Sequence, residues 1–282
     1  MCKTALALGT FDGLHIAHKK VLSLAEGCER KIAITFDVPP AMVLTQKCEL
    51  IISNSKKEDM LAKLGFGIQT LDFPLVRTVE PTEFLKGLLE KYNPTRICCG
   101  FNYRFGRNGG GDITLLRNFC SANGIELCVA NEVEALGDRV SSSRIRELIQ
   151  NGDVARANEL LGYRFSVEGV VAHGDGRGRK MSHPTVNFPY PEDIVQARHG
   201  VYSARCFIDG KEYRAVTYIG NRPTYSLSSC ICETNILDFS GDLYGKELCV
   251  ELCRFLRDDR KFSSLDELKK QIELDIKIAS EN

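Results

Sequence analysis

A short polar segment near the beginning of the chain combines residue types that suit phosphate chemistry. Residues 9–18 read GTFDGLHIAH and lie between a short apolar run and a helical pattern. Glycine lets a backbone turn tightly beside a phosphate, and the first N–H groups of a helix lack partners. His15 and His18 are three residues apart, so both imidazoles lie on one face of the first helical turn. The segment predicts a site that stabilises charge on a phosphoryl group, rather than two surface histidines.

A second polar segment lies in the other half of the chain. Residues 169–179 read GVVAHGDGRGR, and residues 184–187 read PTVN. The glycine spacing matches neither the Walker A loop nor the dinucleotide-binding fingerprint. Hydroxyl and amide oxygens, however, are hard ligands that suit Mg²⁺ carrying ATP phosphates. Thr185 and Asn187 are two residues apart, so they face the same way if the segment is extended.

The elements that must position the first segment alternate between strands and helices. Apolar runs predict strands at residues 5–8, 31–36 and 95–100, and helical patterns predict helices at 15–26, 56–64, 81–91 and 113–122. Such alternation is typical of a parallel sheet covered on both faces. These sheets bind ligands at the carboxyl ends of their strands, where the 9–18 segment lies.

Two further helices are predicted at 141–150 and 153–161, and the pattern changes after residue 162. Five strands are then predicted at 165–171, 200–208, 213–219, 230–238 and 247–255, followed by a closing amphipathic helix at 263–278. Several short strands separated by glycine, asparagine and proline turns indicate a small β-barrel. We therefore expect two domains, residues 1–162 and 163–282.

Composition excludes several classes of protein. Hydrophobic residues make up 43% of the 282 residues and charged residues 26%, which is typical of folded cores. Lys+Arg and Asp+Glu each total 37, so no global attraction to nucleic acid or to an anionic membrane is expected. The first apolar run is too short for a signal peptide, and none approaches the roughly 18 residues of a membrane span. We expect a cytoplasmic protein with neither nucleic acid nor membrane as partner.

The twelve cysteines are spread along the chain and include no C-x-x-C pair. Cys98 and Cys99 are adjacent, and Cys230 and Cys232 are one residue apart; neither spacing suits a zinc site or a redox pair. Most lie in apolar runs, where a free cysteine packs as a small hydrophobic residue. We interpret them as core residues.

The 9–18 segment resembles the His-x-x-His signature of adenylyl- and cytidylyl-transferring enzymes. Those enzymes join ATP or CTP to a phosphate-bearing partner without a protein nucleophile, and their second motif is a Ser/Thr cluster followed by arginine at a helix start. Residues 140–146, VSSSRIR, fit that motif. The resemblance implies that Ser142, Ser143 and the helix N-terminus hold the outgoing phosphates while Arg146 neutralises them.

A third segment, residues 100–107 (GFNYRFGR), is similar to a strand-end segment of bacterial FAD synthetases. By that resemblance Asn102 contacts the nucleotide or the flavin phosphate, and Arg139 is a further candidate. The complete set of nucleotide-binding candidates in this half is Gly9, Phe11, Asp12, Asn102, Arg139, Ser142, Ser143 and Arg146, beside the catalytic pair His15 and His18. A glycine-rich surface loop is the alternative interpretation of this segment.

The Pro-Thr-x-Asn element at 184–187 resembles the hallmark of riboflavin kinases. It implies that Thr185 and Asn187 are metal ligands, with Gly174, Gly178 and Arg179 binding the nucleotide. Riboflavin kinases carry a glutamate on the strand that Glu233 occupies. The resemblance makes Glu233 the general base, which takes the proton of the ribityl hydroxyl as that oxygen attacks the γ-phosphate.

Taken together, the two motif sets resemble bacterial bifunctional riboflavin kinase/FAD synthetase from Gly9 to Ile278. The implied fold is α/β: a Rossmann-like nucleotidyltransferase domain with a parallel sheet, then a small riboflavin kinase-like β-barrel with a terminal helix. The implied reactions use Mg²⁺ with ATP, convert riboflavin to FMN and then to FAD, and release pyrophosphate. We expect a monomer. The narrower alternative is a kinase whose other half transfers CMP or has lost its activity.

Overall fold

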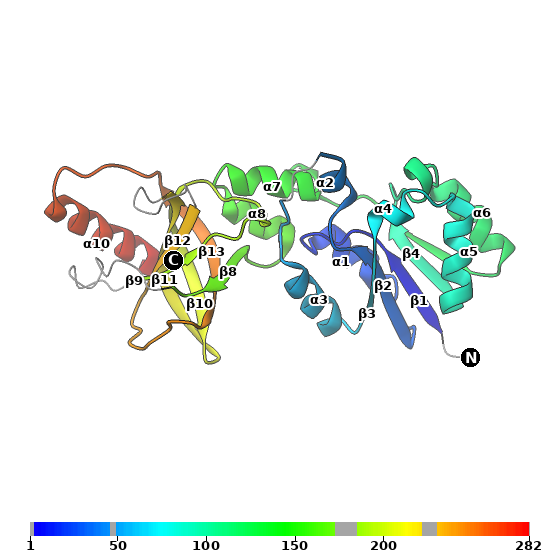
Figure 1. The fold of residues 1–282 in the computed structure, drawn as a ribbon, viewed down its shortest axis with the longest axis horizontal. Coiled ribbons are helices and arrows are strands. Elements are labelled where there is room, and N and C mark those ends of the chain that lie inside the picture. The colour runs from blue at the N-terminus through cyan, green and yellow to red at the C-terminus, as the bar shows by residue number, and fades with distance from the viewer. Residues whose placement is uncertain (1–2, 46–48, 173–184, 222–229, 282) are drawn as a thin grey trace. The chain divides into compact units, whose positions relative to one another are not determined.

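The structure is a computed structural model that describes residues 3–45, 49–172, 185–221 and 230–281. Its contacts divide the chain into two compact units, Met1–Ser142 and Ser143–Asn282 (Figure 1). Among the described helices, none is long and apolar enough to cross a membrane.

A parallel sheet forms the centre of the first unit. The described strands are β1 (Thr4–Leu8), β2 (Arg30–Phe36), β3 (Gly67–Leu71), β4 (Arg96–Gly100) and β5 (Glu126–Ala130). They lie in the order β3-β2-β1-β4-β5, and every neighbouring pair is parallel. The chain runs outward from β1 to β3 and then returns to the other side of β1. The predicted parallel sheet is confirmed, and a crevice is expected at the carboxyl ends of β1 and β4, where the order reverses.

Helices line this sheet (Figure 1). They are α1 (Ile16–Ser23), α2 (Pro40–Thr45), α3 (Asn54–Lys63), α4 (Phe73–Val76), α5 (Pro81–Tyr92) and α6 (Ile113–Ala122), with a 3₁₀ turn η1 (Arg107–Gly109) and a hairpin of β6 (Glu134–Ala135) and β7 (Asp138–Arg139). Leu6 and Leu8 of β1 pack in one buried cluster with Phe84 and Leu88 of α5 and with Leu116 of α6. Alternate side chains of a strand point to opposite faces, so Leu6 and Leu8 lie together on the face of the sheet that α5 and α6 cover.

An antiparallel sheet forms the centre of the second unit. Its described strands are β8 (Ser166–Val170), β9 (Thr185–Pro189), β10 (Gly200–Ile208), β11 (Lys211–Asn221), β12 (Cys230–Ile236) and β13 (Glu247–Arg257). Their order is β8-β13-β10-β11-β12-β9. The two edges approach one another through a bridge between Ala172 and Asn187, so the sheet nearly closes. The predicted small barrel is confirmed.

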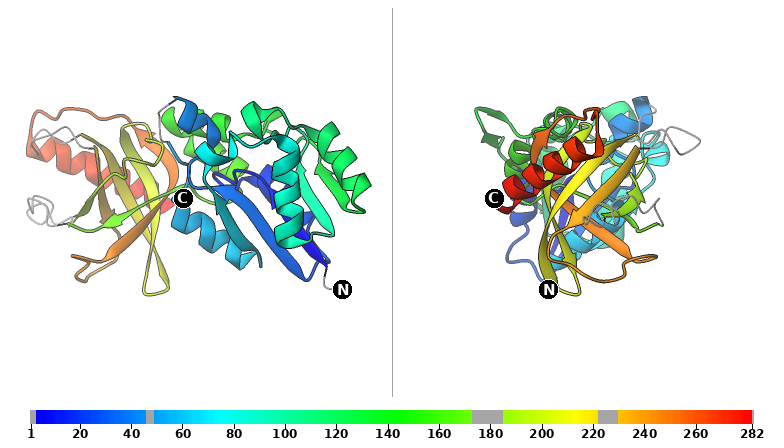
Figure 2. Two further views of the ribbon diagram at one scale, coloured as in Figure 1. Left: turned by 45° about the vertical axis from the view of Figure 1, so that its right-hand side comes forward. Right: turned by 90° about the vertical axis from the view of Figure 1, so that its left-hand side faces the viewer.

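The helices described in the second unit are α7 (Ser142–Gln150), which begins at the last residue of the first unit, α8 (Val154–Leu161) and α10 (Leu265–Glu281). The amide of Asn158 joins α8 to the barrel, because its nitrogen donates to Leu252 O at 2.9 Å and its oxygen accepts from Phe165 N at 2.7 Å. Helix α10 lies against the barrel strands (Figure 2), where buried Asp275 pairs with Arg257 at 2.9 Å. The sequence boundary at residue 162 falls between α8 and β8 and stays a prediction.

Candidate active site

The turn between β1 and α1 is the most constrained segment of the first unit. Phe11 and Leu14 are buried non-glycine residues with φ of 50° and 36°, values that only a strongly determined environment maintains. Gly13 has φ of 79°, and a Cβ added there would lie 2.9 Å from Ile51 Cδ1. Asp12 provides the long-range contacts. Its carboxylate accepts from Ile51 N at 3.0 Å, and its carbonyl oxygen accepts from Ser142 Oγ at 3.0 Å.

This turn brings the two histidines together at the start of α1. His15 is the N-cap residue, and its Nδ1 accepts from His18 N at 3.3 Å. The His15 proton is therefore on Nε2 when the ring is neutral. The two rings are stacked with centroids 3.6 Å apart, and the Phe11 ring meets the His18 ring edge-on at 5.5 Å.

Burial, assisted by the neighbouring His15 ring, holds the pKa of His18 well below its usual value. His18 is therefore neutral at neutral pH and acts as an uncharged hydrogen-bonding group. Its Nδ1 is buried and finds no hydrogen-bond partner within the part of the chain that the structure describes. A buried nitrogen without a partner is costly in a folded protein, so it indicates a functional group.

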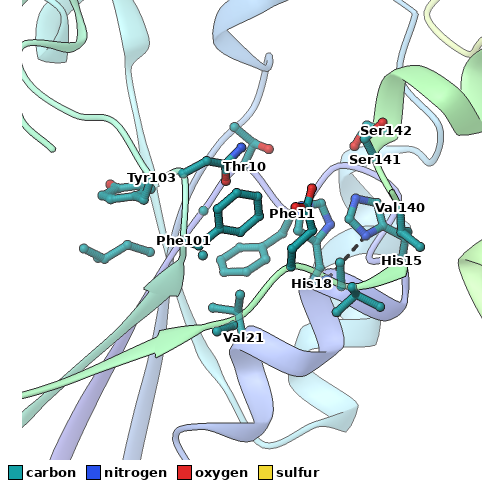
Figure 3. A pocket seen from close by; sticks show the side chains of 18 of the residues that line it. Thr10, Phe11, His15, His18, Val21, Phe101, Tyr103, Val140, Ser141 and Ser142 are labelled. Atoms are coloured by element: carbon teal, nitrogen blue, oxygen red, sulfur yellow. Dashed lines mark hydrogen bonds between the residues drawn. The ribbon is translucent and has the colours of Figure 1, made fainter. Parts of the chain in front are cut away.

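The histidines lie in the wall of a cavity of about 320 Å³ at the carboxyl ends of the parallel strands. Figure 3 shows the two imidazoles side by side at the beginning of α1, with Phe101 and Tyr103 contributed by the segment after β4. Seven predicted residues line this cavity: Gly9, Phe11, His15, His18, Asn102, Arg139 and Ser142. Asp12 supports the turn, as described above. Ser143 and Arg146 lie further along α7, in the second compact unit.

Arg139 is held at the cavity by two groups that the sequence motifs did not indicate. Its guanidinium carbon lies 5.1 Å from the centroid of the Phe101 ring, and its Nε lies 3.1 Å from Glu132 Oε1. Phe101 directly follows β4, a strand that the sequence predicts. Its position at the carboxyl end of that strand is a signal that could identify it as a cavity residue. Glu132 follows β5, a strand that the apolar patterns do not predict, and no sequence motif includes this residue.

An aromatic cavity of about 380 Å³ adjoins the first one. The two share four lining residues, Phe36, Pro40, Tyr103 and Arg104. Further rings come from Phe73, Phe84 and Phe105, and Phe36 meets Phe73 edge-on at 5.6 Å. A cavity lined by histidine, serine and arginine and a ring-lined cavity are thus adjacent within one unit, which suits a ligand with a polar group at one end and a flat apolar ring at the other.

The barrel brings together the polar side chains predicted in its half of the chain. Strands β9 and β12 pair antiparallel, so Glu233 lies directly opposite Asn187. The hydroxyl of Thr185 donates to Glu233 Oε1 at 2.8 Å. Thr185 also lines a cavity of about 310 Å³ bordered by residues 239–244. The predicted nucleotide-binding residues Gly174, Gly178 and Arg179 lie outside the described residues.

The polar side chains gathered at both sites carry oxygen and nitrogen atoms rather than thiols. Among the described residues, no three side chains of His, Cys, Asp or Glu are grouped as a metal site. Burial raises the pKa of Cys98 and Cys99 to about 12, so both thiols are uncharged core groups. The hydroxyl, amide and carboxylate oxygens of Thr185, Asn187 and Glu233 are hard donors. They fit Mg²⁺, which in nucleotide sites takes a few protein ligands and substrate phosphates.

Comparisons with known proteins cover nearly the whole chain. The family model for FAD synthetase matches residues 1–144, and the model for riboflavin kinase matches residues 161–282. A bifunctional riboflavin kinase/FMN adenylyltransferase of Listeria monocytogenes is 30% identical over 96% of this chain and 89% of its own length. The Bacillus subtilis protein of the same description is 32% identical, over 97% and 90%. A crystal structure of a macrolide-efflux protein from Streptococcus pneumoniae gives a TM-score of 0.89 at 27% identity, over 99% of this chain and 94% of that one.

Proposed function

The chain belongs to the family of bifunctional riboflavin kinases/FMN adenylyltransferases, and we propose that its two polar clusters are the two active sites. The protein phosphorylates riboflavin to FMN and adenylylates FMN to FAD, with ATP as the donor in both steps. The observation that carries the assignment of the sites is that each cluster lies within one compact unit, the His15–His18 pair in the first and the Thr185–Glu233 pair in the second.

In the first unit, an FMN phosphate oxygen attacks the α-phosphorus of ATP. A new P–O–P bond forms, the bond to the β-phosphate breaks, and pyrophosphate leaves. The adjoining aromatic cavity takes the isoalloxazine ring, which directs the FMN phosphate toward the histidines. Because this reaction needs no protein nucleophile, catalysis consists of positioning and charge stabilisation.

The two histidines act as hydrogen-bond donors to the reacting phosphates. His15 keeps its proton on Nε2, since its Nδ1 already accepts from His18 N. The lowered pKa of His18 keeps that ring uncharged, so it donates one N–H without repelling a cation nearby. Gly9, Phe11 and Asp12 shape the turn. Asn102, Arg139 and Ser142 hold the nucleotide phosphates within the first unit. Ser143 and Arg146 follow Ser142 in the same sequence motif, and by that motif we assign them to the same phosphates.

In the second unit, Glu233 is the general base of the kinase step. The terminal ribityl hydroxyl attacks the γ-phosphorus of ATP, its proton passes to the Glu233 carboxylate, and ADP leaves. The 2.8 Å hydrogen bond from the Thr185 hydroxyl orients the Glu233 carboxylate beside the residues that bind the nucleotide. Gly174, Gly178 and Arg179 complete the nucleotide site.

Magnesium accompanies ATP in this proposal, with Thr185 and Asn187 as its protein ligands. When bound, the ion neutralises phosphate charge that would otherwise repel the attacking oxygen. The side chains of Thr185 and Asn187 supply oxygen atoms from one face of β9, which supports the assignment. The residues around them orient the carboxylate and the substrate hydroxyl.

We further propose a domain boundary at residue 162, a monomeric chain and a cytoplasmic location. The separate matches at residues 1–144 and 161–282 support two modules joined through α7 and α8. The balanced charge supports partners that are small molecules rather than nucleic acid.

The experiment that tests the function is a time course with riboflavin and Mg-ATP, followed by chromatographic separation of riboflavin, FMN and FAD. FMN should appear first and FAD later, and FMN supplied alone should be converted to FAD. Replacing ATP by CTP in the second step tests the alternative donor. Faster use of CTP than of ATP in that step would contradict the assignment of FAD synthesis.

A further inference from the structure

Lys57 is a buried lysine that neither reaction uses. It lies on α3, its residue is only 4% exposed, and its Nζ donates to Phe36 O at 2.7 Å. Burial lowers the pKa of this ammonium, while the nearby carboxylates of Asp12 and Asp37 act in the opposite direction. A buried cation is rarely kept unless its charge is compensated, so the contacts of Lys57 point to a role.

One hydrogen bond links Lys57 to the wall of the adenylyl-transfer cavity, and an attraction between charges links it to the neighbouring turn. Phe36 is the last residue of β2 and lines both adjoining cavities. Asp12 is 2% exposed and belongs to the turn that ends at His15. Its carboxylate accepts from Ile51 N, and Ile51 lies two residues before the N-cap of α3. The beginning of α3 is therefore linked to the turn by this hydrogen bond, and α3 itself by the charge of Lys57.

The turn depends on such support because its conformation is unfavourable. Phe11 and Leu14 have positive φ, a backbone conformation that costs free energy in a residue other than glycine. The attraction between the Lys57 ammonium and the buried Asp12 carboxylate is one support of this turn, and removal of the ammonium weakens it. The turn could then relax and carry the stacked histidines with it.

We propose that Lys57 is a positioning residue for adenylyl transfer, whose buried ammonium holds Asp12 and the end of β2 so that His15 and His18 stay at the cavity. Lys57 touches neither substrate in this proposal. It acts through the turn, which rests on the function proposed above for the histidines.

The test uses Lys57→Gln in the full chain, since glutamine can still donate to a carbonyl oxygen but carries no charge. A small displacement of reacting groups costs up to about a hundredfold in rate. We expect kcat for FAD formation from FMN to fall about ten- to hundredfold, with the KM for FMN and for ATP changed less than about twofold. The kinase reaction in the barrel should be unchanged and serves as an internal measure of folding. Lys63→Met, at an exposed position of the same helix, is the matched control.

Two further variants separate positioning from simple stability. Lys57→Arg keeps the charge and should restore kcat to within about threefold of the original. In Asp12→Asn/Lys57→Gln the losses should not multiply, because both changes break one interaction. An unchanged kcat in folded Lys57→Gln, a Lys57→Arg enzyme with kcat reduced tenfold or more, or multiplying losses would each overturn the proposal. If Lys57→Gln does not fold, the Lys57→Arg result decides alone. Failure of the proposed function itself would instead appear as normal FAD synthesis in His15→Ala.

Discussion

At the scale of single residues, the first cavity places the uncharged imidazole of His18 against the ring of His15. His18 is half-buried against His15 and Phe11, and burial opposes its protonation. Its Nδ1 finds no partner among the described residues. In the proposed site, an uncharged donor approaches the phosphates, and Arg139 and Arg146 compensate the phosphate charge.

The lowered pKa of His18 predicts how the stability of the first unit depends on pH. Below the usual histidine pKa the unfolded chain binds a proton that folded His18 does not bind, so the free energy of unfolding should decrease as pH falls from 7 toward 5. Thermal unfolding of the wild type and of His18→Asn across that range measures the effect. The variant should lose part of the pH dependence, whereas His199→Asn in the barrel should retain it. Equal pH dependence in wild type and His18→Asn would show that His18 protonates normally in the fold.

The aromatic cavity gives a second prediction at this scale. Phe73 meets Phe36 in its wall, and aromatic contacts contribute about 0.5–1.5 kcal/mol beyond their buried area. Phe73→Ala should therefore raise the KM for FMN about three- to tenfold and leave the KM for ATP and the kinase step unchanged. Steady-state kinetics with each substrate varied in turn measure this. Phe207→Ala, at an exposed barrel position, is the control. A rise in the KM for ATP alone would place the nucleotide, not the flavin, in this cavity.

At the scale of elements, the turn from β1 to α1 determines where His15 and His18 lie. Gly13 and Gly27 both have φ of 79°, but a Cβ at position 13 would meet Ile51 whereas position 27 opens to free space. Gly13→Ala should destabilise the first unit by about 1–3 kcal/mol and strongly reduce FAD formation. Gly27→Ala should show only the backbone part of the loss and normal FAD formation. Thermal unfolding and both assays decide this, and equal activity in the two variants would contradict the role of the turn.

Most elements could be predicted from the sequence, and the exceptions have a physical reason. Strands β1, β2 and β4 lie in the middle of the sheet and are apolar on both faces, so their sequences stand out. Strands β3 and β5 are the edges. Residues 67–71, GIQTL, mix polar and apolar types because the edge is only partly buried.

The same contrast holds for the sites. His15, His18 and Ser142 belong to local motifs at helix starts, where spacing along the chain reveals the geometry. Phe73 and Glu132 come from distant segments that only the fold brings to the cavities. Lys57 was not predicted either, since a lysine on a helix normally faces solvent. Its burial results from the packing of α3 against β2, which the helical pattern alone does not reveal.

At the scale of the whole molecule, the His15–His18 pair and the Thr185–Glu233 pair lie in separate compact units of one chain. Each unit has its own core, its own cavity and its own polar cluster. A substitution in one cluster should therefore leave the other reaction intact, and FMN released by one molecule should be usable by another.

Two variants and their mixture test this claim most directly. With riboflavin and Mg-ATP, His15→Ala should accumulate FMN, and Glu233→Gln should leave riboflavin unconverted while still making FAD from added FMN. Loss of one hydrogen-bond donor to developing charge costs about 10²–10³-fold, and loss of a general base about 10²–10⁴-fold, so each loss should be unmistakable by chromatography. Glu247→Gln, an exposed barrel position, is the control for the second variant. Mixing the two variants should restore FAD formation from riboflavin. If either substitution abolishes both reactions in a folded protein, or if the mixture makes no FAD, the account is contradicted.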